Sequence, residues 1–164
     1  MTGLNGTERV RSLAKSFRFA ARGVRYCVRN ERNMRIHLTA AAYVLVFSAF
    51  YSLSATQYAV LLLVIALVLF AETVNTAVEA VVNLQTQCYD NIARIAKDVA
   101  AGAVMITAFF AVIVGLLFFL KPPTLAAIVL FLLAHPLWGI CFLFSLPCAC
   151  LFIFCYPAAP LHRR

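Results

Sequence analysis

The sequence predicts an all-α integral membrane protein, with an N-terminal amphipathic surface helix, three transmembrane helices and an extra C-terminal hydrophobic segment. Three observations support this prediction. Hydrophobic residues make up 64% of the 164 residues and charged residues only 12%, a composition too apolar for a soluble domain. Several apolar runs are long enough to cross a bilayer. The positive charge is concentrated, because nine of the fourteen Lys and Arg lie between residues 9 and 35.

Residues 9–35 are expected to form the surface helix. Apolar and basic side chains each recur in this segment every three or four residues, which is the period of a helix. The basic stripe consists of Arg11, Lys15, Arg18, Arg22, Arg25, Arg29 and Arg32. A helix with one apolar and one basic face should lie in the plane of the membrane interface. Anionic lipid of the inner leaflet is its expected partner, and nucleic acid is not, because membrane helices follow directly.

Three transmembrane helices are expected after the surface helix, at about 38–53, 58–84 and 91–120. Asp90 is the expected N-cap of the third. The positive-inside rule keeps the basic arm in the cytoplasm, which makes the uncharged turn between the first two spans external. The loop before the third span carries Arg94 and Lys97 and is then cytoplasmic again, so the three assignments agree on a multi-pass protein with a cytoplasmic N-terminus.

Residues 122–164 are a separate C-terminal hydrophobic extension whose role the sequence leaves open. The 33 residues from 124 to 156 carry no Lys, Arg, Asp or Glu, and Pro136 and Pro147 interrupt them. A single kinked span or a re-entrant hairpin would fit this pattern. His135 has no partner in its span, which favours a structural role over a ligand role. The six cysteines are expected to act as small hydrophobic side chains.

The stretch FAETVNTAVEAVVNL, residues 70–84, places polar side chains in the second span. Glu72, Asn75, Glu79 and Asn83 are spaced by three, four and four residues, so they share one face of the helix. A charged side chain at mid-bilayer costs roughly 2.5–3.5 kcal/mol on insertion scales. Asparagines alone could join helices, but two glutamates without a basic residue in the spans fit that role poorly. The stripe therefore indicates a functional site.

Three kinds of function fit carboxylates near the cytoplasmic end of a span. A small proton-coupled transporter would use Glu72, and a membrane scaffold would perform no chemistry. Metal-assisted phosphoryl transfer would use both glutamates, because Mg²⁺ is often held by one or two carboxylates together with substrate phosphates. Lys97, Asp98 and Glu31 would add charged groups to such a site. No P-loop or G-x-G-x-x-G motif occurs, so a nucleotide would be bound without one.

Three motifs occur in order along the chain: NERNMRIHL at 30–38, AETVNTAVEAVVNL at 71–84 and ARIAKDVAAGAV at 93–104. Together they resemble the prokaryotic diacylglycerol kinase family, which includes undecaprenol kinase of Gram-positive bacteria. The resemblance extends over about residues 16–120. It implies that residues 1–121 are a membrane lipid kinase of the bacterial plasma membrane, a homotrimer with active sites shared between protomers.

The resemblance also implies the reaction. The family transfers the γ-phosphate of ATP, with Mg²⁺, to a membrane lipid alcohol in lipid recycling for phospholipid or cell-wall synthesis. The segment ERNMRIHL, residues 31–38, is more similar to the Gram-positive members. Undecaprenol is therefore favoured over diacylglycerol as the substrate.

Single residues acquire expected roles from the same resemblance. Glu72 matches the family's general base, and Asn75 matches the asparagine of the same helix motif, so both are expected to be catalytic. Glu31 and Glu79 match the pair that binds the divalent metal. The positions that match nucleotide-binding residues are Phe19, Glu31, Glu79, Cys88, Tyr89, Asp90, Lys97 and Asp98. Asn83 replaces an aspartate of the family, and Cys88 and Asp90 depart from its loop motif, which bears on nucleotide affinity.

Overall fold

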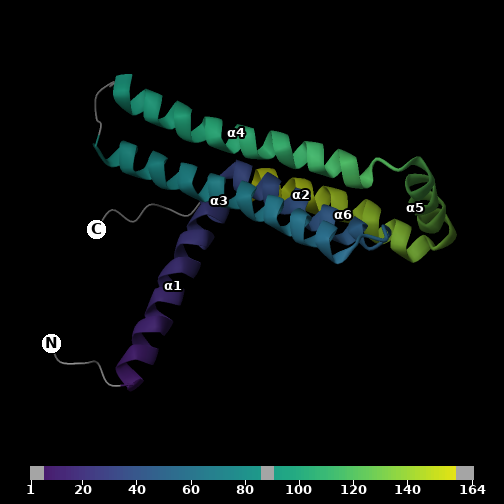
Figure 1. Cartoon of the computed structure of the whole chain (residues 1–164), viewed down its shortest axis with the longest axis horizontal. Coiled ribbons are helices and arrows are strands. Elements are labelled where there is room, and N and C mark those ends of the chain that lie inside the picture. The colour runs from purple at the N-terminus through teal and green to yellow at the C-terminus, as the bar shows by residue number, and fades with distance from the viewer. Residues whose placement is uncertain (1–5, 86–90, 158–164) are drawn as a thin grey trace.

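A computed structural model of the chain describes residues 6–85 and 91–157. Within these two ranges the secondary structure consists of helices without a strand, which confirms the all-α prediction. The helices are α1 (Gly6–Asn30), α2 (Arg32–Ser48), α3 (Ala55–Gln85), α4 (Asn91–Phe119), α5 (Pro122–Ala134) and α6 (Pro136–Cys155). Helices α3 and α4 form a long antiparallel pair, α2 and α6 lie beside it, and α1 projects away from the bundle (Figure 1).

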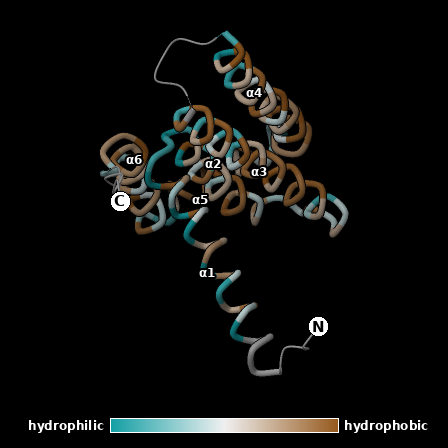
Figure 2. The backbone as a smooth tube through the Cα atoms, turned by 90° about the vertical axis from the view of Figure 1, so that its left-hand side faces the viewer, coloured by the Kyte–Doolittle hydropathy of each residue, from teal (hydrophilic) through white to brown (hydrophobic). Residues whose placement is uncertain are grey.

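Helix α1 is shorter than the surface helix expected over residues 9–35. It ends at Asn30, and Glu31 adopts an extended conformation with φ −105° and ψ 118° before α2 begins. The expected helix is therefore wrong at its C-terminal end, where Arg32 and Arg35 belong to α2. The helical spacing of side chains continues across the break, so periodicity did not reveal it. Along α1 hydrophilic and hydrophobic residues alternate at helical spacing (Figure 2).

A buried arginine stabilises this break. Nη1 of Arg35 donates hydrogen bonds to the carbonyl oxygens of Val28, at 3.1 Å, and Arg29, at 3.2 Å. These carbonyls belong to the last turn of α1, where no amide of the same helix is available to them. The cationic guanidinium also complements the partial negative charge at a helix C-terminus. Arg35 thereby fixes the end of α1 against the start of α2.

Three helices are long and apolar enough to cross a membrane, and they differ in part from the expected spans. They are Ala55–Leu84, Asn91–Phe119 and Pro136–Cys155. The last two expected spans correspond to α3 and α4, whereas the first, at 38–53, falls on α2, which ends at Ser48. With 17 residues, α2 is about 26 Å long, slightly short of the ~30 Å hydrocarbon core. The third candidate span is instead α6 of the C-terminal extension.

The C-terminal extension forms two helices rather than a single kinked span, and the re-entrant hairpin stays a prediction. The chain breaks at His135, and a proline occupies the first turn of both α5 and α6, a position where its missing N–H costs nothing. Pro147 remains inside α6. The ring of His135 stacks on Phe131 at 4.4 Å, and Nδ1 of His135 lies 3.0 Å from the carbonyl oxygen of Phe131. These contacts agree with a structural role for His135.

Helix α6 packs along α2 through aromatic and polar contacts. The hydroxyl groups of Tyr43 and Ser145 are hydrogen-bonded at 2.8 Å, and Phe142 lies edge-on to the ring of Phe47 at 5.5 Å. The extension is thus attached to the helix that leads directly from Glu31. Cysteines 27, 141, 148, 150 and 155 are free thiols, and Cys88 lies outside the described residues.

Candidate active site

Glu72 is the most buried carboxylate of the described chain. It lies on α3 with 1% of its side chain exposed. Neither carboxylate oxygen has a hydrogen-bond partner within residues 6–85 and 91–157. A buried carboxylate without hydrogen bonds is unfavourable, so its retention indicates that a proton, a cation or a substrate hydroxyl completes the site.

Asn75 and Thr76 surround Glu72 on the next turn of α3, and both are buried. Oγ1 of Thr76 donates a hydrogen bond of 2.9 Å to the carbonyl oxygen of Glu72. Nδ2 of Asn75 donates a hydrogen bond of 3.1 Å to Oε1 of Glu79. Oδ1 of Asn75 is buried and, like the carboxylate of Glu72, has no partner in the described structure. Of the predicted polar stripe, Glu72 and Asn75 are therefore buried, Glu79 is half-buried and Asn83 is exposed.

Glu31 joins this cluster from the break between α1 and α2. Burial and the negative charge of Glu79 raise the pKa of Glu31 above its ordinary value, while the guanidinium of Arg35 acts in the opposite direction. The negative charges of Glu31 and Glu79 also act on Glu72. The fold thus brings together the three carboxylates that the sequence singled out, although Glu31 is 41 residues from Glu72 in the chain.

Lys97 lies at the edge of this cluster. Its Nζ donates a hydrogen bond of 2.7 Å to Oδ1 of Asn83, one turn beyond Glu79 on α3. Asp98 instead faces Arg94 on the surface of α4, where Nε of Arg94 and Oδ2 of Asp98 are 3.8 Å apart and both side chains are exposed. Lys97 is therefore placed beside the acidic cluster, whereas Asp98 points into solvent.

Phe19, another expected nucleotide contact, is not brought to the cluster. Phe19 lies on α1 with 60% of its side chain exposed, about 17 Å along the helix from Asn30 at 1.5 Å per residue. The guanidinium of Arg22 lies 5.3 Å from the centre of its ring. Cys88, Tyr89 and Asp90, including the expected N-cap, lie outside the described residues.

The donor set of the cluster fits Mg²⁺. Glu31 and Glu79 supply carboxylates, and Asn75 supplies a buried amide oxygen without a partner. These are the hard oxygen ligands that Mg²⁺ prefers, and Mg²⁺ commonly takes only one or two carboxylates from the protein. In the described part of the chain no group of three or more His, Cys, Asp or Glu side chains could hold a metal ion.

An apolar pocket of about 290 Å³ lies on the turns of α3 that precede Glu72. Helices α2, α3 and α4 all contribute to its walls, and α3 contributes Val68 and Leu69, one turn before Glu72. The site therefore has a hydrocarbon-lined side within the bundle and a charged side at Glu31 and Lys97. This arrangement suits a ligand with an apolar chain and a polar end.

Sequence reasoning missed the part that Arg35 plays in this site. It was counted only among the basic residues of the N-terminal segment, yet it is 7% exposed and binds the last carbonyls of α1 beside Glu31. Its position four residues after Glu31, and hence one helical turn away, is the signal that could have identified it. The hydrogen bond between Asn83 and Lys97 was also missed, because it joins two different helices.

Comparisons with known proteins agree with the resemblance of the three motifs. The family model described as "Prokaryotic diacylglycerol kinase" matches residues 18–119. The chain is 45% identical over 112 residues to a diacylglycerol kinase of Synechocystis, covering 68% of this chain and 64% of that protein. It is 41% identical over 106 residues to an undecaprenol kinase of Bacillus subtilis, covering 65% of this chain and 86% of that protein.

The extent of these matches separates the two parts of the chain. The matched region contains every described residue of the acidic cluster and ends at the C-terminus of α4. The extension that forms α5 and α6 lies beyond it. Since the family model covers well over half of the 164 residues, the chain belongs to the prokaryotic diacylglycerol kinase family.

Proposed function

We propose that the protein is a lipid kinase that transfers the γ-phosphate of ATP to the hydroxyl group of a membrane lipid alcohol. The observation that carries this proposal is the buried carboxylate of Glu72, which has no hydrogen-bond partner in the described chain. It lies between an apolar pocket and the pair formed by Asn75 and Glu79. Both family relatives are named as lipid kinases, which agrees with a site of this form.

Glu72 acts as the general base in this mechanism. Its carboxylate accepts the proton of the lipid hydroxyl, whose oxygen forms a bond to the γ-phosphorus of ATP. The bond between the γ-phosphorus and the oxygen that bridges it to the β-phosphate breaks, and ADP leaves with that oxygen. The apolar pocket beside Val68 and Leu69 holds the start of the lipid chain, which keeps the hydroxyl at the level of Glu72.

The other charged residues position the nucleotide. Glu31 and Glu79 would hold Mg²⁺, and Asn75 orients the carboxylate of Glu79 through its hydrogen bond. Mg²⁺ bound there would neutralise negative charge on the phosphates of ATP. Lys97 leaves Asn83 to contact the phosphates, since an ammonium gains more from a phosphate than from a neutral amide. Phe19, Cys88, Tyr89, Asp90 and Asp98 complete the proposed nucleotide site.

The proposed active unit is a homotrimer with sites shared between protomers. The distance of Phe19 from the acidic cluster of its own chain supports this arrangement, because α1 projects away from the bundle (Figure 1). The proposed setting is the bacterial plasma membrane with a cytoplasmic N-terminus. The basic residues of the N-terminal segment support this orientation and an association with anionic inner-leaflet lipid.

Undecaprenol is the proposed substrate, ahead of diacylglycerol, and the product would serve lipid recycling for cell-wall or phospholipid synthesis. The segment ERNMRIHL and the high coverage of the Bacillus subtilis undecaprenol kinase support this choice. The Synechocystis relative is named a diacylglycerol kinase, so undecaprenol and diacylglycerol must be compared directly as substrates.

Transfer of the γ-phosphate of labelled ATP tests the proposal. The purified full chain is assayed in mixed micelles with undecaprenol, diacylglycerol and a panel of other lipid alcohols, and Glu72→Gln serves as the matched inactive variant. Labelled lipid phosphate that depends on Glu72 is the expected product, with undecaprenol the faster substrate. A different result would contradict the kinase function: protons move across vesicle membranes without ATP, and no alcohol receives phosphate. That result would favour a proton-coupled transporter.

A further inference from the structure

The C-terminal extension and α2 enclose an apolar groove on the side of the bundle away from Glu72. The groove has a volume of about 800 Å³ and is bounded by α2, the end of α5 and one face of α6. Aromatic side chains dominate its walls: Tyr43, Phe47, Phe50, Phe131, Trp138, Phe142 and Phe152. It is more than twice as large as the pocket beside the acidic cluster. The family match does not cover α5 and α6, so the family supplies no role for this groove.

The hydroxyl groups that line the groove already have partners in the protein. Tyr43 and Ser145 are hydrogen-bonded to each other at 2.8 Å, and Oγ1 of Thr39 donates a hydrogen bond of 2.8 Å to the carbonyl oxygen of Arg35. The lining contains no charged side chain. Since a polar ligand would lose its hydration without gaining comparable hydrogen bonds here, the groove suits a hydrocarbon.

The groove is elongated along the helices. Its lining on α6 extends from Trp138 to Phe152, a distance of about 21 Å at 1.5 Å per residue. On α2 and the turn that follows it, the lining extends from Leu38 to Phe50. This length is about two thirds of the ~30 Å hydrocarbon core of a bilayer. An extended lipid chain lying parallel to the helices has the shape of this groove, and α6 is itself long and apolar enough to cross the membrane.

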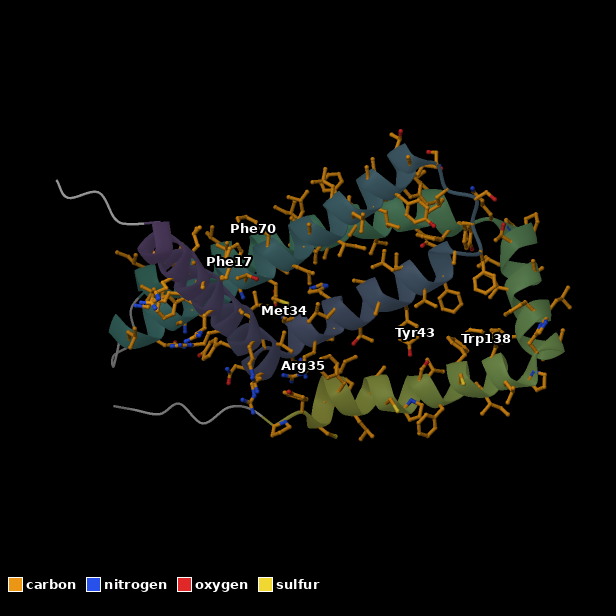
Figure 3. All side chains as sticks on the ribbon, turned by 90° about the horizontal axis from the view of Figure 1, so that it is seen from below. Phe17, Met34, Arg35, Tyr43, Phe70 and Trp138 are labelled. Atoms are coloured by element: carbon orange, nitrogen blue, oxygen red, sulfur yellow. The ribbon has the colours of Figure 1, made fainter. Side chains whose placement is uncertain are left out.

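The two ends of the groove differ in charge. Arg35 lies beside α6 at the end opposite Trp138 (Figure 3), and its Nε donates a hydrogen bond of 3.0 Å to the carbonyl oxygen of Ile153. Arg29 and Arg32 are close by in sequence, and Nε of Arg29 is buried without a partner in the described structure. The five arginines between residues 22 and 35 outnumber the three carboxylates of the nearby cluster, Glu31, Glu72 and Glu79, so this end retains an excess of positive charge, which attracts an anionic headgroup.

We propose that this groove binds one hydrocarbon chain of an anionic phospholipid, whose phosphate lies at the arginines of the α1–α2 junction. The hydrocarbon chain occupies the space between α2 and α6. It contacts the face of α6 that the rest of the protein leaves uncovered. This lipid is a bound structural component and not the alcohol that is phosphorylated, so the proposal is independent of the kinase reaction.

Trp138 makes the groove directly measurable, since it is the single tryptophan of the chain and lines the groove. The purified full chain in detergent micelles is titrated with phosphatidylglycerol carrying brominated chains, and quenching of tryptophan fluorescence is recorded. Phosphatidylcholine with the same brominated chains is the comparison. We expect saturable quenching by phosphatidylglycerol, with half-saturation at a concentration about tenfold lower than for phosphatidylcholine because of the arginines.

Two cysteines supply a matched pair of variants. Cys148 lines the groove, whereas Cys150, two residues further along α6, does not, and both are exposed. Residues two apart on a helix face nearly opposite sides, so Cys148→Phe places a ring in the groove and Cys150→Phe places the same ring outside it. Cys148→Phe should weaken the saturable quenching, and Cys150→Phe should leave it at the level of the natural chain.

The unsubstituted chain alone can overturn the proposal, so the test does not depend on folding of the variants. Quenching that rises in proportion to brominated lipid without saturating would show only bulk lipid against an exposed tryptophan. Saturable quenching with equal half-saturation for the two headgroups would overturn the assignment of the arginine end. Trp138 protected from all brominated lipid would instead show that a second copy of the chain covers the groove.

Discussion

Nδ2 of Asn75 donates a hydrogen bond of 3.1 Å to Oε1 of Glu79, one turn further along α3. This bond orients the carboxylate of Glu79 and leaves Oδ1 of Asn75 as a buried acceptor beside the carboxylate of Glu72. The carboxylate of Glu72 and Oδ1 of Asn75 thus remain as buried acceptors on one helix face, without a donor in the described structure. Such a cluster is unfavourable for the isolated protein and becomes favourable when a cation binds, which is the basis of the predictions that follow.

Glu72→Gln should lower turnover by about 10²–10⁴-fold, because the amide cannot accept the proton of the lipid hydroxyl. ATP and Mg²⁺ should still bind, since neither is assigned to Glu72. Phosphate transfer and equilibrium nucleotide binding are measured on the same preparation. Thr73→Val, at the adjacent position, is the control and should retain the natural rate. More than a tenth of the natural rate in Glu72→Gln would count against the base role.

Glu31→Ala and Glu79→Ala should each raise the Mg²⁺ concentration needed for half-maximal activity, because each leaves one protein carboxylate to hold the ion. The measurement is a Mg²⁺ titration of phosphate transfer at saturating ATP and lipid alcohol. Asn33→Ala, an exposed position on α2 close to Glu31, is the matched control. A titration that coincides with that of the natural chain would remove the substituted residue from the metal site.

Glu31→Gln should raise the melting temperature in Mg²⁺-free buffer at neutral pH. The raised pKa of Glu31 means that the native state binds this proton more tightly than the unfolded chain does. Native stability therefore falls as the pH rises from the ordinary glutamate pKa through the raised value. Glutamine does not titrate, so the difference between variant and natural chain should shrink as the pH falls through this window. A variant that melts at a lower temperature at neutral pH would contradict the cause assigned to the shift.

Lys97→Gln should raise the KM for ATP and lower kcat, since Lys97 offsets the charge that develops on the transferred phosphoryl group. The variant keeps a side chain that can hydrogen-bond to Asn83, so the structure of the α3–α4 pair is retained. Lys121→Gln, at the other end of α4, is the control for loss of one positive charge. Equal KM values for ATP in the two variants would place Lys97 outside the nucleotide site.

Arg35→Met should destabilise the protein by several kcal/mol. Its guanidinium binds the carbonyl oxygens of Val28, Arg29 and Ile153, and a buried acceptor left without a donor costs about 1–3 kcal/mol. Thermal unfolding in micelles measures the effect, with the exposed Arg32→Met as the control for charge. Equal melting temperatures of these two variants would show that the three hydrogen bonds do not hold the helix ends.

The spacing of side chains along the sequence was sufficient to predict much of the fold. The helical character, the two longest spans and the polar stripe of α3 were predicted from side-chain spacing, since each depends on residues within one or two turns of each other. The helix boundary at Glu31 was not predicted, because the residues on both sides of the break have the same helical periodicity. The split of the extension at His135 was also missed, although Pro136 and the contact with Phe131 are local features. The packing of α6 on α2 was missed because it depends on contacts between distant segments.

The sequence by itself determined that the chain is helical and apolar, which residues carry charge within it, and that Glu72, Asn75 and Glu79 share one helix face. It could do so because hydrophobicity and helical spacing are local properties. Only the tertiary structure decided that Glu31 joins these residues, that Lys97 pairs with Asn83, and that Arg35 connects α1 with the end of α6. Each of these relationships joins residues on different helices, and their approach is set by packing of whole elements, which spacing along one helix does not encode.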